Sequence, residues 1–472
     1  MPLILPANTL SSGYDIDNSL RFHDGDTTYL TRTHGASGST RTFTFSCWVK
    51  FSDMKTGSSA ADCCHGIFAS EEEAGHQFFI STDEGKLRIA DYQDGSYNLH
   101  LITNRLFRDY SAWYHLCIIF DTTNGTEGDR CKVYVNGVRE TSFGTAVYPS
   151  VNTDLYGNGN QAHFIGRRGG SNTMYFDGYM ADVNFIDGTA AAHTEFGETN
   201  DNGVWVPKKF SGSYGTNGFF LEFGNTGTGQ GSGRFASDTS GQGNHYDTNN
   251  FSGQYQMTDS PTNNFCTYNP LDTGSGSTFS KGNLNTNTGD NKNDIGTIGF
   301  QNGKWYWEVQ CAGSGVVGVQ HESVNHLNDT NLNDDVGSVA YSSHHGVIFH
   351  NNNSDSSPVS DTNGCIIGCA VDMDNNKIYW HKDGTYIDTS GGTQNPTTAA
   401  NPITVATGTN TSGFWFPKLA SGSSSQTYES NFGNPSFSIS SGNADANGYG
   451  NFEYAVPSGF YALCTKNLAE FG

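Results

Sequence analysis

Basic residues are scarce in this sequence, and this scarcity limits the partners that the protein can bind. Lysine and arginine together number 24, against 47 aspartate and glutamate residues, which gives a formal net charge of −23 at pH 7. A surface of this sign repels the phosphate backbone of nucleic acids and the headgroups of anionic lipids. We therefore expect no nucleic-acid partner.

Long apolar runs are also missing. The longest runs, such as Cys117 to Phe120, have the length of a strand, whereas a membrane-spanning helix needs roughly 20 apolar residues. Residues 1–10 lack the basic region and the long apolar stretch of a secretory signal peptide. We expect neither membrane insertion nor a signal peptide.

The residue patterns of common hydrolases are absent. Glycosidases on β-sandwiches carry their carboxylates on one strand as Glu-x-Asp-x-x-Glu, because acid and nucleophile flank the scissile bond about 5 Å apart. The sequence has no such array, and Glu71, Glu72 and Glu73 are consecutive, so they cannot converge on one face of a strand. No G-x-S-x-G elbow or phosphate-binding G-x-x-x-x-G-K-[ST] loop occurs. We predict no catalytic residue and a protein that is not an enzyme.

Cysteine and histidine patterns for metal binding are weak. The ten cysteines include no paired C-x-x-C knuckles, and most lie in apparent strands, so we expect reduced, buried thiols. A metal or a disulfide is the alternative for Cys63-Cys64-His65 and for Cys365 to Cys369. His321 and His326 are five positions apart, whereas the zinc-protease helix needs four. We expect a loop there.

Two further groups resemble metal ligands in type but have a simpler interpretation. His344-His345 and His350 lie near strand-like residues, which predicts exposed imidazoles in a strand-turn-strand. Asp372, Asp374 and Asn375 offer the hard oxygen ligands that calcium prefers. The same residues also shape hairpin turns, so the sequence predicts no metal site and no cofactor, with calcium as the alternative.

The residues that are abundant predict an all-β protein. There are 59 glycines, many Asn, Ser and Thr residues, and 13% aromatic residues, a mixture expected of short strands joined by turns. A buried strand and an alternating strand from Leu116 to Val138 predict an antiparallel hairpin, and a similar cassette returns from Gly368 to Gly384. A chain of 472 residues is longer than a single hydrophobic core usually accommodates. We therefore predict two tandem antiparallel β-sandwich (jelly-roll) domains.

The boundaries of these domains follow from a change in composition. Residues 226–279 are rich in Gly, Asn and Ser, which predicts a linker between a domain of residues 1–225 and a domain of residues 280–472. Phe251, Tyr255 and Phe265 are the side chains able to fix this linker to a domain surface.

The order of motifs in the first domain resembles the laminin-G-like, concanavalin A-like sandwich family. The motifs are Phe45-Ser-Cys-Trp48-Val, Trp113-Tyr-His115, Lys132-Val-Tyr-Val-Asn-Gly137, Ile165-Gly-Arg167 and Phe176-Asp-Gly-Tyr-Met-Ala-Asp-Val183. The second domain, from Gly303-Lys-Trp305-Tyr-Trp307-Glu-Val309 onward, is similar to SPRY domains. The alternation predicts that Trp305, Trp307 and Val309 face the core of that domain, and that Lys304, Tyr306 and Glu308 form a polar face.

The pairing of these two domains is similar to virion structural proteins of tailed marine bacteriophages. The resemblance implies a location in the virion, contact with other virion subunits, and a tail-fibre or appendage role in host adhesion or structural display. A capsid-decorating or assembly protein is one alternative, and a polysaccharide-degrading enzyme is another. Phage fibres are commonly trimers, but no heptad run specifies one here, so we expect a homo-oligomer built through sheet edges or loops.

Loops on rigid sheets are natural sites for ligand recognition. Tyr92, Asp94 and Tyr97 lie in one predicted loop of the first domain, and Tyr156, Asn158 and Asn160 lie in another. These loops offer the aromatic faces, carboxylates and amides that sugar binding requires, although ordinary turns use the same residues. They are the candidate binding residues for a host surface glycan.

Overall fold

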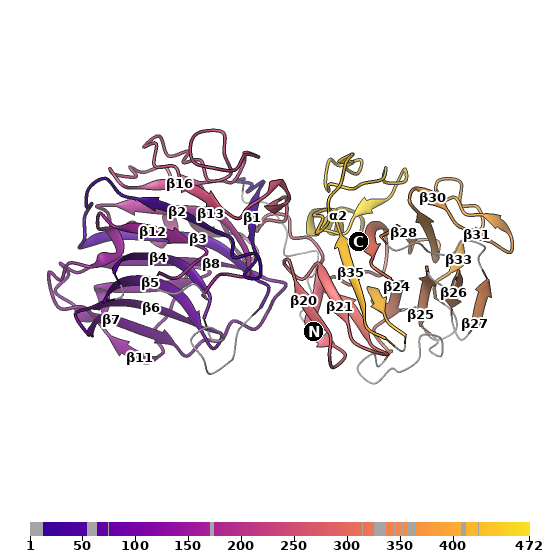
Figure 1. Cartoon of the computed structure of the whole chain (residues 1–472), viewed down its shortest axis with the longest axis horizontal. Helices are drawn as coiled ribbons and strands as arrows, with labels where there is room; N and C mark the ends of the chain where they lie inside the picture. The colour runs from indigo at the N-terminus through magenta and orange to yellow at the C-terminus, as the bar shows by residue number, and fades with distance from the viewer. Residues whose placement is uncertain are drawn as a thin grey trace. The chain divides into compact units, whose positions relative to one another are not determined.

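The computed structural model describes residues 13–53, 64–73, 75–169, 174–313, 315–324, 337–343, 346–350, 353–356, 364–406, 412–422 and 424–472. Strands form nearly all of its regular structure, which confirms the predicted all-β fold (Figure 1). The chain divides into two compact units, one of residues 11–262 and one that contains residues 263–472.

Two eight-stranded sheets form the first unit. The sheet that we call the β3 sheet has the order β10 (Val138–Arg139), β9 (Cys131–Val135), β8 (Trp113–Asp121), β3 (Thr42–Phe51), β13 (Gly178–Asp187), β1 (Ser19–Phe22) and β18 (Gln256–Met257), with β16 (Phe219–Leu221) paired to β13. The second, the β5 sheet, has the order β11 (Phe143–Val147), β7 (Ser96–Thr103), β6 (Lys86–Gln93), β5 (His76–Asp83), β4 (Gly66–Glu73), β12 (Ala162–Ile165), β2 (Tyr29–Thr33) and β17 (Asp247–Asn249). A short ribbon of β14 (Gly197–Thr199) and β15 (Trp205–Pro207) accompanies them.

The main core of the first unit lies between these two sheets. Phe43, Phe45, Cys47 and Val49 alternate along β3, and all four pack in one buried cluster with residues of the β5 sheet such as Phe68. Their common inward face follows from the alternation of side chains along a strand. The predicted hairpin is also confirmed, because β8 and β9 pair in antiparallel register.

The predicted linker, residues 226–279, differs from the structure. Its first part belongs to the first unit, where β17 pairs with β2 and β18 pairs with β1. Tyr246 and Tyr255 are buried in the core cluster there, and Phe251 packs against it. The remaining part, from Asn263 onward, belongs to the second unit, in which Phe265 is buried. The aromatic side chains bury enough apolar surface to order a segment whose composition is otherwise that of a linker.

The second unit also contains two large sheets. The seven-stranded β24 sheet has the order β19 (Tyr268–Thr273), β22 (Asn293–Gly296), β34 (Trp415–Ala420), β24 (Val316–His321), β25 (Ser338–Ser342), β26 (Val347–His350) and β27 (Asn353–Ser356). The nine-stranded β23 sheet has the order β20 (Thr278–Ser280), β21 (Asn285–Thr288), β35 (Gln426–Asn431), β23 (Lys304–Cys311), β28 (Ile366–Asp372), β29 (Lys377–Lys382) and β30 (Thr385–Tyr386), with β33 (Ile403–Thr404) on β29 and β36 (Tyr461–Ala462) on β23. A ribbon of β31 (Asp388–Thr389) and β32 (Gly392–Thr393) and the helix α2 (Thr465–Phe471) complete the unit.

The core of the second unit lies between its sheets and contains the predicted indoles. Trp305, Trp307 and Val309 of β23 pack in one buried cluster with Val317 and Val319 of β24. The second predicted hairpin is confirmed, because β28 pairs with β29 in antiparallel register. The nine cysteines among the described residues are all buried, and Cys63 lies outside those residues.

The buried His115 side chain should make the first unit less stable as the pH falls. His115 Nδ1 lies 3.1 Å from the Trp205 indole N–H, which donates to it, and His115 Nε2 lies 2.8 Å from Ser46 Oγ. Burial, together with the nearby charge of His193, lowers the pKa of His115 to about 3. An unfolded histidine takes up its proton near pH 6.5. The unfolded state therefore binds more protons as the pH falls below about 6.5, and stability is lost from there toward about pH 3.

We expect a His115→Gln variant to lose stability less steeply over this range, because glutamine does not titrate. Chemical denaturation at pH 7, 6, 5 and 4 measures the slope of the free energy of unfolding against pH. Identical slopes for both proteins would show that His115 does not contribute to acid unfolding.

Candidate functional site

The two predicted binding loops converge at one histidine. Tyr92 and Tyr97 lie opposite each other in the β6–β7 hairpin, with ring centroids 4.9 Å apart, and Asp94 occupies its turn with a φ of 48°. His76, the first residue of β5, places Nε2 2.9 Å from Asp94 Oδ1. Its ring also stacks on Tyr156, at a centroid distance of 5.2 Å and an interplanar angle of 7°. Asp94 and Tyr156 therefore meet at His76, and the Tyr92–Tyr97 pair flanks the same turn. We call these five residues the His76 site.

The buried carboxylate of Asp91 holds the residues of this site in place through hydrogen bonds. Asp91 accepts hydrogen bonds from the Tyr156 backbone N–H at 2.7 Å, from Gln93 Nε2 at 2.7 Å and from Asn98 Nδ2 at 3.3 Å. Burial raises the pKa of Asp91 to about 6, and the hydrogen bonds oppose this rise. Asp91 therefore fixes the loop of Tyr156 to β6.

Cationic groups continue the site across the outer face of the β5 sheet. Arg88 Nη2 donates to the Tyr97 hydroxyl at 2.9 Å, and the Tyr97 ring stacks on His100 at 4.2 Å. The Arg88 guanidinium lies 5.2 Å from the centre of the Phe79 ring, and that of Arg168 lies 3.8 Å from the same ring. Tyr97 is still 37% exposed. The site thus offers an accessible aromatic ring between a carboxylate turn and a guanidinium group.

The structure corrects the predicted set at Asn158. Its side chain is fully buried, and Asn158 Nδ2 donates to Ser39 O at 3.1 Å and to Asp187 Oδ1 at 2.6 Å. Asn158 therefore holds the 3-10 turn Tyr156–Asn158 in place and does not face a ligand. Asn160 is exposed beyond that turn. His76, Arg88 and His100 were not predicted, because only the pairing of β5, β6 and β7 places them beside the tyrosines.

The residues considered as metal ligands in the second unit have other partners. Asp372 Oδ1 and Oδ2 accept from the backbone N–H and the side chain of Asn375, and Lys304 Nζ lies 2.8 Å from Asp372 Oδ2. Asp374 Oδ1 accepts from the Gly303 N–H at 2.8 Å. These bonds support the prediction that the three residues shape a hairpin turn.

The histidines considered as ligands are likewise dispersed. His321 Nε2 lies 2.8 Å from Ser412 O, and His350 Nε2 lies 3.0 Å from Asp355 Oδ2. His326, His344 and His345 lie outside the described residues.

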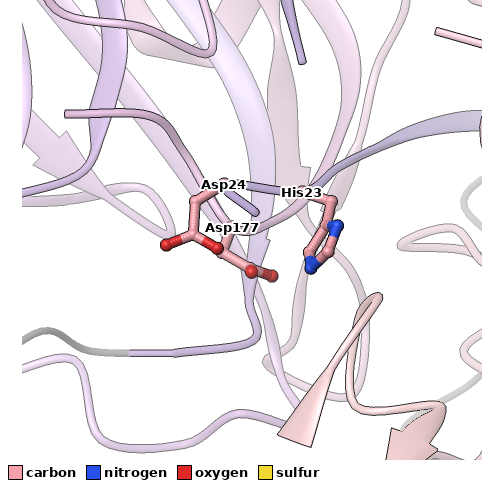
Figure 2. Close-up of side chains that lie close together, drawn as sticks. All are labelled: His23, Asp24 and Asp177. Carbon is pink, nitrogen blue, oxygen red and sulfur yellow. The ribbon is translucent and has the colours of Figure 1, made fainter. Parts of the chain in front are cut away.

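One cluster in the described part of the chain has the composition of a metal centre. His23, Asp24 and Asp177 each direct one potential ligand atom toward the others, and these atoms all lie within 4.8 Å of one another. Figure 2 shows the Asp177 carboxylate between the Asp24 carboxylate and the His23 ring. His23 and Asp24 follow β1, and Asp177 precedes β13. The sequence does not predict this cluster, because 153 positions separate Asp24 from Asp177.

Comparisons with known proteins identify the two domains. Residues 24–194 match the Laminin_G_3 family, described as the concanavalin A-like lectin/glucanases superfamily, and residues 304–418 match the SPRY domain family. The chain therefore contains a laminin-G-like, concanavalin A-like domain and a SPRY domain, as its motifs predict. No curated protein matches the sequence.

Several solved structures are similar to parts of the chain. The SPRY domain of human HERC1 is 18% identical over 34% of this chain and 96% of that one, with a TM-score of 0.27. A heptameric SAP-like pentraxin from Limulus polyphemus is 17% identical over 38% of this chain and 81% of that one, with a TM-score of 0.28. A putative carbohydrate binding protein from Bacteroides ovatus is 14% identical over 50% of this chain and 59% of that one, with a TM-score of 0.29.

None of the described helices combines the length and the apolar character that crossing a membrane requires.

Proposed function

We propose that the chain is a non-enzymatic glycan-binding protein of a tailed phage particle, located in a tail fibre or another appendage. The observation that carries the binding function is the His76 site, where the Tyr92–Tyr97 pair flanks the Asp94 turn and His76 contacts both Asp94 and Tyr156. The ordered motifs of the two domains support the location in a virion. The ligand is a glycan of the host surface.

The chemistry of the His76 site suits a sugar ring. An exposed tyrosine presents an apolar face and a polar edge, so it can pack against the C–H face of a pyranose while its hydroxyl remains hydrogen-bonded. Asp94 supplies an acceptor for sugar hydroxyls, and Arg88 supplies charged donors that suit hydroxyl or carboxylate oxygens. His76 and Asp91 hold the two loops in register, so a ligand meets groups that are already positioned.

Replacing Tyr97 by alanine tests this proposal. We expect Tyr97→Ala to weaken glycan binding at least about tenfold, a loss of about 1.4 kcal/mol, because the variant removes the most accessible ring of the site. A glycan array with the purified full chain identifies the ligand, and calorimetry then gives the dissociation constants of both proteins.

Tyr134→Ala is the matched control. Tyr134 stacks on His193 at 4.0 Å, much as Tyr97 stacks on His100, but it belongs to the β3 sheet. The control should bind glycan as the unchanged protein does. Equal binding by Tyr97→Ala would remove the His76 site from the proposal, and release of reducing ends from host polysaccharide would favour an enzyme instead.

We also propose that the protein forms a homo-oligomer in the particle and contacts other virion subunits there. Exposed apolar residues at sheet edges support an edge contact, since Val138 on β10 and Val147 on β11 are 60% and 43% exposed. Electron microscopy of intact particles locates the protein and counts its copies. Isolated copies in the particle, together with a monomer in light scattering at high concentration, would contradict the oligomer.

A further inference from the structure

We propose that His23, Asp24 and Asp177 bind a divalent metal ion in the first unit. The strand register brings them together, because Phe22 at the end of β1 pairs with Gly178 at the start of β13. His23 and Asp24 continue from one strand, and Asp177 precedes the other. The cluster is therefore fixed by the sheet itself.

The spacing of the donor atoms fits one shared ion. Metal–ligand bonds of about 2.0–2.4 Å allow two ligand atoms of the same ion to lie up to about 4–5 Å apart. The three potential ligand atoms all lie within 4.8 Å of one another. In Figure 2 the Asp24 carboxylate and the His23 ring lie on either side of the Asp177 carboxylate.

The carboxylate of Asp177 supplies an independent reason to expect a cation. Asp177 is only 5% exposed, and its Oδ1 atom is buried without a hydrogen-bond partner among the described residues. The Asp24 backbone N–H donates to this carboxylate, but the Asp24 carboxylate also contacts it. Buried polar atoms are normally paired, so an unpaired oxygen in a carboxylate beside a second carboxylate marks a position that a cation can occupy.

The electrostatics of the cluster agree with this interpretation. The Asp24 and Asp177 carboxylates lie close together, and two carboxylates at this separation repel each other. A divalent ion between them neutralises both carboxylates and removes this repulsion.

The donor set indicates which ion to test first. One imidazole beside two carboxylates suits Zn²⁺ or Mn²⁺ better than Ca²⁺, which prefers oxygen ligands alone. His23 Nδ1 lies 2.9 Å from Asp26 Oδ2. A carboxylate of this kind orients a histidine ligand and increases its basicity.

The test uses the full chain without an affinity tag, freed of metal by chelation. Calorimetric titration with Zn²⁺ or with Mn²⁺ should show one equivalent bound, and Asp24→Asn and Asp177→Asn should each abolish that binding. A titration with Ca²⁺ gives the comparison and should show weaker binding. Asp355→Asn is the control, because Asp355 also pairs with a histidine, at 3.0 Å from His350, but lies in the second unit.

Thermal melting distinguishes a variant that has lost the metal site from one that is merely less stable. At about 100 times the dissociation constant, the metal should raise the melting temperature of the first unit by roughly 5–10 °C, and it should not do so in Asp24→Asn. In chelator alone, Asp24→Asn should melt no earlier than the unchanged protein, because it removes a like-charge contact. Absence of stoichiometric binding, or binding that survives both substitutions, would overturn the proposal.

Discussion

Replacing Trp307 by alanine is expected to lower the free energy of unfolding of residues 263–472 by about 3–5 kcal/mol. The Trp307 side chain is fully buried, and its ring lies 6.4 Å from that of Phe300 and 6.1 Å from that of Phe432. Removing the indole leaves a cavity between two sheets that cannot close completely. Such a loss is a large share of a domain stability of about 5–15 kcal/mol.

Differential scanning calorimetry of the full chain measures this effect. The transition of the second unit should move to a much lower temperature or lose its cooperativity, whereas that of the first unit should not move. Leu271→Ala is the control in the same unit, because Leu271 is 55% exposed and its truncation should cost less than about 0.5 kcal/mol. An unchanged melting temperature with a loss of binding would place Trp307 on a recognition surface.

Replacing Asp259 by alanine is expected to destabilise the first unit by about 3–5 kcal/mol, because it leaves a lysine charge buried. Lys50 Nζ lies 2.9 Å from Asp259 Oδ2, with side-chain exposures of 1% and 2%. Asp259 Oδ1 also accepts a hydrogen bond from Trp113 Nε1 at 3.1 Å. The pair connects residues near the end of the unit to β3 and β8 in its centre.

A double variant distinguishes the net contribution of the ion pair to stability from the destabilisation caused by leaving Lys50 unpaired. Lys50→Met combined with Asp259→Leu should recover most of the stability that Asp259→Ala loses, since a buried ion pair is often replaceable by apolar residues of similar volume. Urea denaturation followed by tryptophan fluorescence measures the three free energies of unfolding. A cost below about 1 kcal/mol for Asp259→Ala would show that water reaches Lys50.

Local patterns in the sequence were sufficient to predict the strands and their inward faces. The alternation in β23 predicts Trp307 as a core residue, because a strand turns successive side chains to opposite faces. Alternation does not predict which residues cover the outer face of the β23 sheet. Lys304, Tyr306 and Glu308 were predicted to form a polar face, yet Tyr306 and Glu308 are fully buried.

The residues that cover this outer face come from the end of the chain. Glu308 accepts hydrogen bonds from the Glu453 N–H at 2.9 Å, from the Tyr454 N–H at 2.8 Å and from the Tyr306 hydroxyl at 2.9 Å. These bonds offset the cost of burying the carboxylate. The sequence near Glu308 does not predict these hydrogen bonds, because its backbone partners lie 145 and 146 positions away.

The same limit applies to the candidate sites. The proximity of Tyr92 and Tyr97 is predictable from the sequence, because a short hairpin turn brings its own flanks together. Asn158 has the same local signals as an exposed turn residue, but contacts with Ser39 and Asp187 bury it. The linker prediction failed for a related reason, since the Lys50–Asp259 pair joins positions 209 apart. Long-range pairing decides these cases, and composition does not encode it.

A structure of the full chain bound to a glycan selected on the array tests the central claim most directly. The account predicts a sugar ring packed on Tyr97 beside Tyr92, with its polar groups within hydrogen-bond distance of Arg88 or Asp94. A glycan bound by the second unit, or on the first unit away from His76, would contradict the account.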